Sequence, residues 1–399
     1  MKKKKFGYFL MTSALVAGIL TGCGTGEKSS TDSGSSTSTE KGEVIKIGAN
    51  LELSGPVASY GSSIAKGVDL AVEEINASGG IDGKKIEIIK VDNKSDAAEA
   101  TNAAIKLTSQ DKVAAIIGAA TSGNTVAQVQ IANDTKTILL TPSGTSPTVT
   151  IGTDGKLNEY AFRTSFIDPF QGTVAANFAL NEIGVKTAAI YADNASDYAK
   201  GLAASFKETF EAAGGKIVSE EAYVAKDTDF RSILTRIKSK EPEFVFIPGY
   251  YEEVGLIVNQ AREMGIDVPL MGADGWDSPK LIELAGAEAL NNTFITNPYS
   301  AEDPDETIQT FVAKFKEKYD GNSPDGFNAL GYDSVYLLAD AIKRGGTDPE
   351  KMKDALASTK DFVLVTGTVT VDDVHNPIKS ATILEYKDGK QIFNTKVNP

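Results

Sequence analysis

The sequence of 399 residues is poor in the side chains on which many enzymes and metal sites depend. It contains one cysteine, Cys23, one histidine, His375, and one tryptophan, Trp276. A lone histidine in a predicted turn argues against histidine metal sites and Ser-His-Asp catalysis. No phosphate-binding loop and no G-x-S-x-G motif are present. A single cysteine cannot form a disulfide within the chain. We therefore expect no enzyme, no metal and no cofactor.

Positive charge and long apolar runs are also scarce. The chain has 40 Lys and Arg against 54 Asp and Glu, a net charge of −14. Four of the lysines are Lys2 to Lys5, and without them 36 basic residues face 54 acidic ones. A nucleic-acid partner is not expected, because phosphate binding needs clustered positive charge. Beyond the N-terminus no apolar run approaches the roughly 20 residues of a membrane-spanning helix.

Residues 1–22 have the features of a lipoprotein signal peptide. Lys2 to Lys5 precede a mostly apolar run, Phe6–Leu20, which is too short to span a bilayer. Leu20-Thr21-Gly22-Cys23 resembles a bacterial lipobox, in which two small residues precede the cysteine that is acylated. We expect a lipid on Cys23. The alternative, an ordinary signal peptide whose cysteine is accidental, stays open.

Residues 23–43 are predicted to be a flexible linker. Gly24 to Gly42 contains no apolar side chain and is dominated by Ser, Thr and Gly. Such a segment cannot bury enough surface to offset its ordering entropy. The expected location is therefore outside the cytoplasm, with the chain anchored by its lipid to the outer face of the cell membrane of a Gram-positive bacterium.

From Val44 onwards, short apolar runs alternate with amphipathic stretches. The apolar runs predict strands at Ile45–Gly48, Ile86–Val91, Val113–Gly118, Thr137–Leu140, Ala188–Ala192, Phe244–Pro248 and Val268–Gly272. Helical spacing occurs at Ile64-Val68-Ala71-Ile75, at Phe206-Phe210-Ala213 and at Ile257-Ala261-Met264. This alternation predicts an α/β fold of parallel sheets covered by helices on both faces.

The alternating pattern occurs twice, in residues 44–140 and 186–272. Two doubly wound parallel-sheet lobes would leave a cleft between the carboxyl ends of their strands, where ligands bind in such sheets. The tail differs, because Val363–Val371, Ala381–Tyr386 and Gln391–Thr395 predict short antiparallel strands. Residues 387–390 predict the hairpin turn before the last of them.

Several motifs resemble the branched-chain amino-acid binding proteins, which are extracytoplasmic receptors of ABC importers. They are Leu53-Ser54-Gly55-Pro56-Val57-Ala58-Ser59-Tyr60-Gly61, Ala71-Val72-Glu73-Glu74-Ile75-Asn76, Gly79-Gly80-Ile81-Asp82-Gly83, Thr141-Pro142-Ser143-Gly144-Thr145, Phe162-Arg163-Thr164, Pro248-Gly249-Tyr250 and Met271-Gly272-Ala273-Asp274-Gly275. The resemblance covers essentially the whole chain after the linker. It implies a periplasmic binding protein-like type I fold with a three-crossover hinge near residues 163, 293 and 360. Lobe 1 would then comprise residues 44–162 and 294–360, and lobe 2 residues 163–293 and 361–399.

The resemblance implies a site for the carboxylate of a free amino acid. Ser122 follows a predicted strand and precedes a helical stretch, so backbone N–H groups and its hydroxyl suit an anion. Taken alone, capping of the helix explains Ser122 equally well. The family uses backbone groups at the position of Ser143, and backbone and hydroxyl at the position of Thr145. Without the resemblance, a Pro-Ser-Gly turn with a capping threonine is the alternative.

Asp274 matches a family glutamate that pairs with the ligand's ammonium. Aspartate is one methylene shorter, so either the ligand lies deeper or a water fills the gap. Tyr60, Tyr198 and Tyr250 match positions that line the cleft and suit an apolar ligand side chain. For Trp276 a place near the pocket mouth and a packing role are both open. No motif supplies a second cation, which favours a neutral, aliphatic amino acid.

The sequence therefore predicts a monomeric, lipid-anchored solute-binding protein. It would capture a neutral, branched-chain amino acid by hinge closure and present it to the permease subunits of an ABC transporter. The alternative is a ligand-sensing ectodomain that signals to a membrane partner. A third possibility, an extracytoplasmic hydrolase, lacks a recognisable catalytic set.

Overall fold

The structure is a computed structural model that describes residues 44–398. The predicted signal peptide, Cys23 and the predicted linker lie outside these residues. Residues 44–398 belong to one compact unit. Within residues 44–398, no helix combines the length and the apolar character that crossing a bilayer requires.

The first sheet is parallel throughout, with the strand order β2-β1-β3-β4-β5. Its strands are β1 (Val44–Leu51), β2 (Lys85–Asp92), β3 (Ala115–Gly118), β4 (Ile138–Thr141) and β5 (Ala161–Arg163), with the helices α1 (Ala58–Ala77), α2 (Ala97–Ile105) and α3 (Ser122–Thr135) between them. The sequence predicts the first four strands. It misses β5, a three-residue strand in which only two residues are apolar.

The second sheet has the order β15-β14-β10-β9-β8-β6-β7. Its strands are β6 (Thr187–Asp193), β7 (Lys216–Tyr223), β8 (Phe244–Phe246), β9 (Leu270–Gly272), β10 (Thr293–Asn297), β14 (Ala381–Lys387) and β15 (Lys390–Val397), and its helices are α4 (Asp168–Phe178), α5 (Asp197–Ala212), α6 (Arg231–Lys238), α7 (Tyr251–Glu263) and α8 (Pro279–Ala285). The strands from β6 to β10 pair in parallel, whereas β14 is antiparallel to β10 and to β15. The antiparallel strands predicted for the tail, Ala381–Tyr386 and Gln391–Thr395, are thus confirmed as β14 and β15, and a terminal hairpin of this kind needs no crossover.

Alternating residues of β6 show that helices cover both faces of the second sheet. Ala188 and Ile190 belong to a buried cluster that includes Phe206 of α5. Ala189 and Tyr191 belong to a different cluster, which contains residues of α6 and α7 and continues to the strands of the first sheet. Since successive strand residues point to opposite faces, these two clusters are the two sides of one doubly wound sheet.

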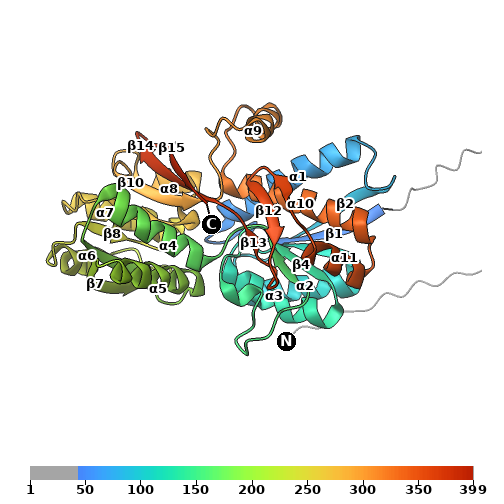
Figure 1. The fold of residues 1–399 in the computed structure, drawn as a ribbon, viewed down its shortest axis with the longest axis horizontal. Helices are drawn as coiled ribbons and strands as arrows, with labels where there is room; N and C mark the ends of the chain where they lie inside the picture. Colours follow the sequence, from blue (N-terminus) through green and yellow to red (C-terminus); the bar gives the residue numbers. More distant parts are fainter. Residues whose placement is uncertain (1–43, 399) are drawn as a thin grey trace, which may run out of the picture. The chain divides into compact units, whose positions relative to one another are not determined.

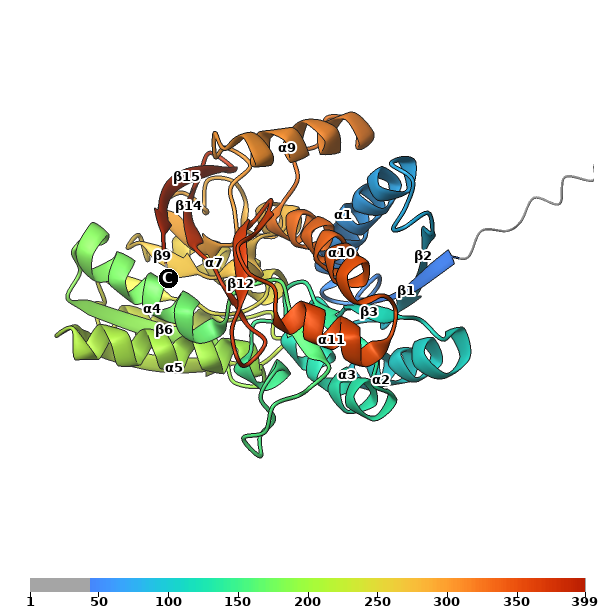
Figure 2. The ribbon, with the colours of Figure 1, turned by 45° about the vertical axis from the view of Figure 1, so that its right-hand side comes forward.

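Three further helices lie between β10 and the C-terminal strands. They are α9 (Glu306–Lys318), α10 (Gly326–Gly345) and α11 (Pro349–Ala357). Although α10 lies far from α1 in the sequence, the two helices pack side by side (Figures 1 and 2). After α11 come β11 (Phe362–Leu364), β12 (Gly367–Val371) and β13 (Pro377–Ile378), which form a small antiparallel sheet of their own.

The chain leaves the first sheet after Arg163 and leaves β10 of the second sheet only after Asn297. A crossing near residue 293 would therefore divide β10. The last passage, towards β14, contains the small antiparallel sheet. The division of the chain into two lobes at the expected boundaries stays a prediction.

The helix patterns read from the sequence match α1, α5 and α7. Ile64, Val68 and Ala71 are buried on one side of α1. Phe206 and Phe210 are buried on α5, which begins where the hydroxyl of Ser196 accepts a hydrogen bond from the peptide N–H of Ala199. In both sheets, helices pack against the strands, and the loops that follow the carboxyl ends of the strands carry the candidate site.

Candidate ligand-binding site

A cavity of about 220 Å³ lies among loops from both sheets. It is lined by Tyr60, Ala120, Thr121, Ser122, Ser143, Tyr198, Tyr250, Asp274, Gly275 and Phe327. The lining therefore combines loops that follow β3, β4, β8 and β9 with residues of α1, α5 and α10. Six of the seven ligand-binding residues predicted from the sequence are among those that line the cavity, and Thr145 is not.

Glu52, which directly follows β1, fixes the loop between β3 and α3. Its carboxylate accepts hydrogen bonds from the peptide N–H groups of Ala120 and Thr121 at 2.9 and 3.1 Å. It also accepts bonds from the Thr121 hydroxyl and the Asn124 amide, both at 2.9 Å. The glutamate is fully buried. Sequence reasoning missed it, although an acid directly after an apolar strand is a signal that could have been used.

Ser122 is the first residue of α3, so it lies where a helix offers unpaired N–H groups to an anion. Its Oγ accepts a hydrogen bond of 3.1 Å from the peptide N–H of Ser146, which leaves its own proton to donate. The Ser143 hydroxyl donates to the carbonyl of Ala120 at 2.8 Å and so joins this loop to the one after β4. Backbone groups of Ser143 therefore suit a ligand better than its hydroxyl does.

Thr145 lies behind the cavity wall and is fully buried. Its Oγ1 has no hydrogen-bond partner within 3.5 Å. The loop around it is held by Arg163, whose guanidinium donates to the carbonyls of Gly144 and Ser146 at 2.6 and 2.8 Å. Arg163 thus orders the segment on which Ser143 and Thr145 lie, a role that the sequence did not reveal.

Asp274 is buried, with 3% of its surface exposed, and its partners are neutral. Its Oδ1 accepts hydrogen bonds from the Tyr198 hydroxyl at 2.7 Å and from the Gln171 amide at 3.1 Å. Burial raises the pKa of Asp274 to about 6, although these two hydrogen bonds lower it. Among the described residues that line the cavity, Asp274 is the one with a formal charge.

A second buried acid, Asp168, begins α4. It is fully buried, and neither of its carboxylate oxygens has a hydrogen-bond partner within 3.5 Å. Burial raises its pKa well above the usual value, and Asp274 raises it further, whereas Thr145 and Arg163 lower it. The sequence offered a usable signal, since this acid follows the motif at residues 162–164 and starts a helix.

Aromatic rings form much of the cavity wall. Tyr198 and Tyr250 are stacked, with centroids 5.1 Å apart. Tyr60 meets Tyr250 edge-on at 5.9 Å and stacks on Phe327 of α10 at 4.3 Å. Phe327 was missed, because its place in the sequence, at the start of a helix remote from the other motifs, does not indicate that α10 packs beside α1.

Two residues singled out in the sequence have packing roles. Trp276 is fully buried, and its indole N–H donates to the carbonyl of Ile247 at 2.9 Å. His375 stacks on Phe162 with ring centroids 3.9 Å apart, and its Nδ1 lies 3.0 Å from the carbonyl oxygen of Ala161. Burial lowers the pKa of His375.

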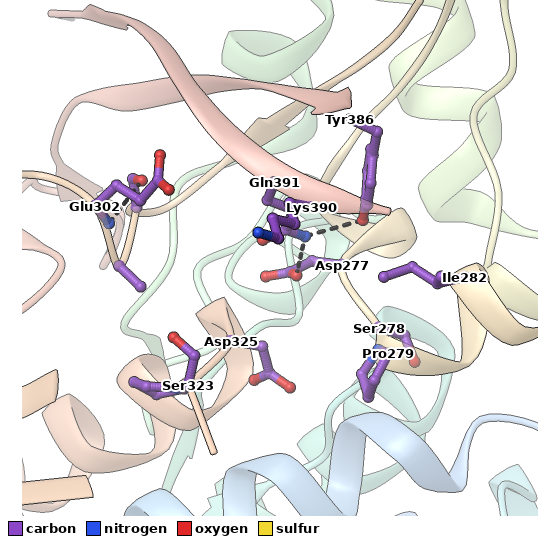
Figure 3. A pocket seen from close by; sticks show the side chains of 13 residues that line it. Asp277, Ser278, Pro279, Ile282, Glu302, Ser323, Asp325, Tyr386, Lys390 and Gln391 are labelled. Atoms are coloured by element: carbon purple, nitrogen blue, oxygen red, sulfur yellow. Dashed lines mark hydrogen bonds between the residues drawn. The ribbon is translucent and has the colours of Figure 1, made fainter. Parts of the chain in front are cut away.

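A larger and more open pocket of about 920 Å³ is lined by Asp277 and Ser278, which follow the turn that carries Asp274 (Figure 3). Asp277 is its most buried acid, and three neutral groups already satisfy it: Gln391, Asn297 and the peptide N–H of Gly326, at 2.6, 2.9 and 2.7 Å. Gln391 also donates to Tyr386 at 2.9 Å. We therefore assign the ligand to the smaller, aromatic-walled cavity.

Comparison with known proteins identifies the family. The model of a family described as "Periplasmic binding protein" matches residues 44–391. The leucine-, isoleucine-, valine-, threonine- and alanine-binding protein of Pseudomonas aeruginosa is 31% identical over 357 residues, which are 89% of this chain and 92% of that protein.

Solved structures agree with this relationship. The branched-chain amino acid transporter substrate-binding protein LivJ of Streptococcus pneumoniae, solved in complex with isoleucine, is 43% identical and has a TM-score of 0.84, with 90% of this chain and 100% of that chain covered. The leucine-binding protein LivK of Thermotoga maritima is 34% identical with a TM-score of 0.84, and the match covers 89% and 99% of the two chains. The fold is that of type I periplasmic binding proteins, as predicted. The chain is a binding protein rather than an enzyme, and it belongs to the periplasmic binding protein family.

Proposed function

We propose that this protein captures a neutral, branched-chain aliphatic amino acid outside the cytoplasm and delivers it to the permease of an ABC transporter. The observation that carries the proposal is the environment of Asp274. A buried carboxylate with only neutral hydrogen-bond donors is costly, and a cationic group in the adjoining cavity would relieve that cost. The ammonium of an amino acid is such a group.

The remaining parts of an amino acid have matching partners in the cavity. The carboxylate would lie at the start of α3, where it accepts hydrogen bonds from backbone N–H groups and from the Ser122 hydroxyl. The loop that carries Ser143 and Thr145 would complete this end. The apolar side chain would contact the rings of Tyr60, Tyr250 and Phe327.

Charge and size narrow the class of ligand. A ligand with an acidic side chain would need a second cation, and Asp274 is the charged group among the described lining residues. The cavity is small, with about 220 Å³ of empty space between its lining residues. Relatives named for binding leucine, isoleucine and valine support the same class.

Calorimetry with residues 42–399, which form one compact unit, tests this proposal. Isoleucine, leucine and valine should bind with micromolar or better affinity, and alanine more weakly. Glutamate and lysine, whose side chains carry an unmatched charge, should show no heat at the same concentrations. If all the neutral amino acids fail to bind at millimolar concentration, the proposed ligand is wrong.

The proposed transport also involves a closing motion and a membrane anchor. We propose that the two sheets with their helices are lobes, which close over the ligand about the three crossings, and that a lipid on Cys23 holds a monomeric protein at the outer face of the membrane. The uptake of labelled isoleucine by cells should fall when the gene is deleted. A Cys23→Ala variant should release the protein into the medium. Unchanged uptake together with a lost transcriptional response to the amino acid would instead favour a sensing ectodomain.

A further inference from the structure

Tyr251 forms hydrogen bonds with Tyr60 and with residues beside it, across the boundary between the two sheets. Tyr251 is the first residue of α7, which connects β8 and β9, and its peptide N–H donates to the Tyr60 hydroxyl at 3.2 Å. The Tyr251 hydroxyl in turn donates to the carbonyl of Pro56 at 2.7 Å and accepts from the peptide N–H of Ser59 at 3.3 Å. The two rings cross edge-to-face with centroids 5.0 Å apart.

A second contact lies beside the first. The hydroxyls of Ser59 and Ser278 are 2.7 Å apart. Ser278 follows the turn that carries Asp274 and caps α8 by accepting a hydrogen bond from the peptide N–H of Lys280. Pro56, Ser59 and Tyr60 thus meet Tyr251 and Ser278, and we call these five residues the clasp.

The clasp joins elements that belong to different sheets. Residues 56–60 lie at the start of α1, next to β1 of the first sheet. Tyr251 and Ser278 belong to helices that flank the second sheet. Tyr60 lines the cavity, whereas Tyr251 and Ser278 are absent from its described lining. Separation of the two sheets would break every contact of the clasp, while leaving the cavity surface of each side intact.

We propose that Tyr251 is a positioning residue that holds the ligand-loaded, closed arrangement shut without touching the ligand. This inference rests on the proposed capture of an amino acid by closure of two lobes. The apparent affinity of such a protein depends on the fraction of molecules that are closed, so contacts outside the cavity control how long the ligand stays. The clasp contributes to dissociation and not to the choice among ligands.

The first test compares Tyr251→Phe with Tyr319→Phe in residues 42–399. The control also loses a tyrosine hydroxyl that donates to a backbone carbonyl of α1, that of Lys66 at 2.8 Å, but its contact involves no residue of the clasp or of the cavity lining. In stopped-flow measurements with isoleucine, Tyr251→Phe should dissociate roughly tenfold faster, with an unchanged association rate. The isoleucine-to-valine affinity ratio and the melting temperature of the ligand-free protein should match those of the wild type.

A second variant tests the contact between Ser59 and Ser278 without measuring a binding affinity or a rate constant. Residues 42–399 contain no cysteine, so Ser59→Cys combined with Ser278→Cys creates the one pair of thiols. These thiols should form a disulfide on mild oxidation, and isoleucine should speed its formation. Isoleucine trapped by oxidation should stay bound until a reductant is added.

The outcomes separate the clasp from the proposed function. The proposed role of the clasp is refuted if the dissociation rate of Tyr251→Phe is unchanged. It is also refuted if faster dissociation is accompanied by a lower melting temperature of the ligand-free variant. Failure of the cysteine pair to cross-link also overturns it. Cross-linking in a protein that binds none of the amino acids would support the closed contact and refute the proposed ligand.

Discussion

The hydroxyl of Tyr198 donates a hydrogen bond of 2.7 Å to Asp274 and accepts one of 2.8 Å from the peptide N–H of Gly275. One phenol therefore positions both the carboxylate and the turn that carries it. Gly275 must be a glycine here, because a Cβ would approach the Tyr198 hydroxyl to 2.8 Å and the carbonyl of Gly249 to 2.6 Å. The acid and the aromatic wall are thus one unit.

Replacement of the acid tests its role. Asp274→Asn keeps the shape but removes the charge that would face the ligand's ammonium. Loss of one partner of a buried charge pair costs about 2–5 kcal/mol, so the affinity for isoleucine should fall roughly thirtyfold or more in calorimetry. Asp354→Asn, at an exposed position of α11, is the matched control and should bind as the wild type does. Equal affinities of the two variants would remove Asp274 from the site.

The affinity for isoleucine should fall at low pH, because Asp274 becomes protonated. Its pKa is about 6 in the free protein, because burial favours the neutral acid. An ammonium beside it favours the charged form, so binding below pH 6 must displace a proton. The affinity should be nearly constant above pH 7 and should fall towards tenfold per pH unit below pH 6.

Neighbouring groups do not reverse this dependence. Asp168 also has a raised pKa through burial and would act in the same direction. The residual binding of Asp274→Asn, measured over the same pH range, gives the part of the pH dependence that Asp168 causes. If the affinity rises as the pH falls from 7 to 5, the assignment of the ammonium to Asp274 is refuted.

Glu52 should matter for both stability and binding, although it does not line the cavity. In the wild type, four hydrogen-bond donors face the Glu52 carboxylate, and Glu52→Gln would replace this carboxylate by an amide. Hydrogen bonds to a charged group contribute about 1.5–3 kcal/mol, and we expect a loss of roughly 3 kcal/mol in the free energy of unfolding. Because the loop before α3 loses its support, the affinity for isoleucine should fall as well. Glu87→Gln, at an exposed position of β2, should change neither quantity in denaturation or calorimetry.

Stability should fall as the pH rises through neutrality, because the pKa of Asp325, which lines the pocket of Figure 3, is raised in the folded protein. Burial raises the pKa of Asp325 to about 7, and Asp277 raises it further, while Ser63, the Asn328 peptide and Lys66 lower it. The pKa of this acid is higher in the folded state than its unfolded value of 3.8. Its contribution to the free energy of unfolding is therefore fully present below pH 3.8 and is lost as the pH rises through 7.

Thermal melts can detect this contribution. Asp325 is only partly buried, so solvent weakens the repulsion, and we expect a loss of about 1 kcal/mol between pH 6 and 8. Asp325→Asn retains a good N-cap residue for α10 and should lose less stability over the same range. An equal pH dependence in the variant would show that other groups cause it.

The limits of the sequence-based predictions have physical causes. The patterns of apolar residues predicted strands that carry a nearly continuous apolar run, such as β3 and β4, which are buried along their whole length. They missed β7, whose Ser219, Glu220 and Glu221 reflect its position at the sheet edge. They also missed β10, an interior strand in which two threonines and an asparagine interrupt the apolar pattern. Edge strands need no continuous apolar run.

The same holds for the candidate site. Residues in recognisable motifs, such as Ser122 and Asp274, could be named from the sequence. Glu52 and Asp168 were missed although each has a local signal in the sequence. Phe327 could not be named, because its relevance depends on which segments the fold brings together. Phe327 reaches Tyr60 only because α10 returns to lie beside α1.

The pairing of β10 with β14 has a consequence for how the molecule is made. All five residues of β10 are buried, and one of its two edges is covered by β14, which begins at Ala381. During synthesis and export, that edge therefore stays open until nearly the whole chain has emerged. Open apolar edges recruit other strands, so aggregation competes with folding throughout this interval. A chain that stops at Ser380 should accumulate in an insoluble form, and supplying the missing hairpin as a peptide should restore its solubility.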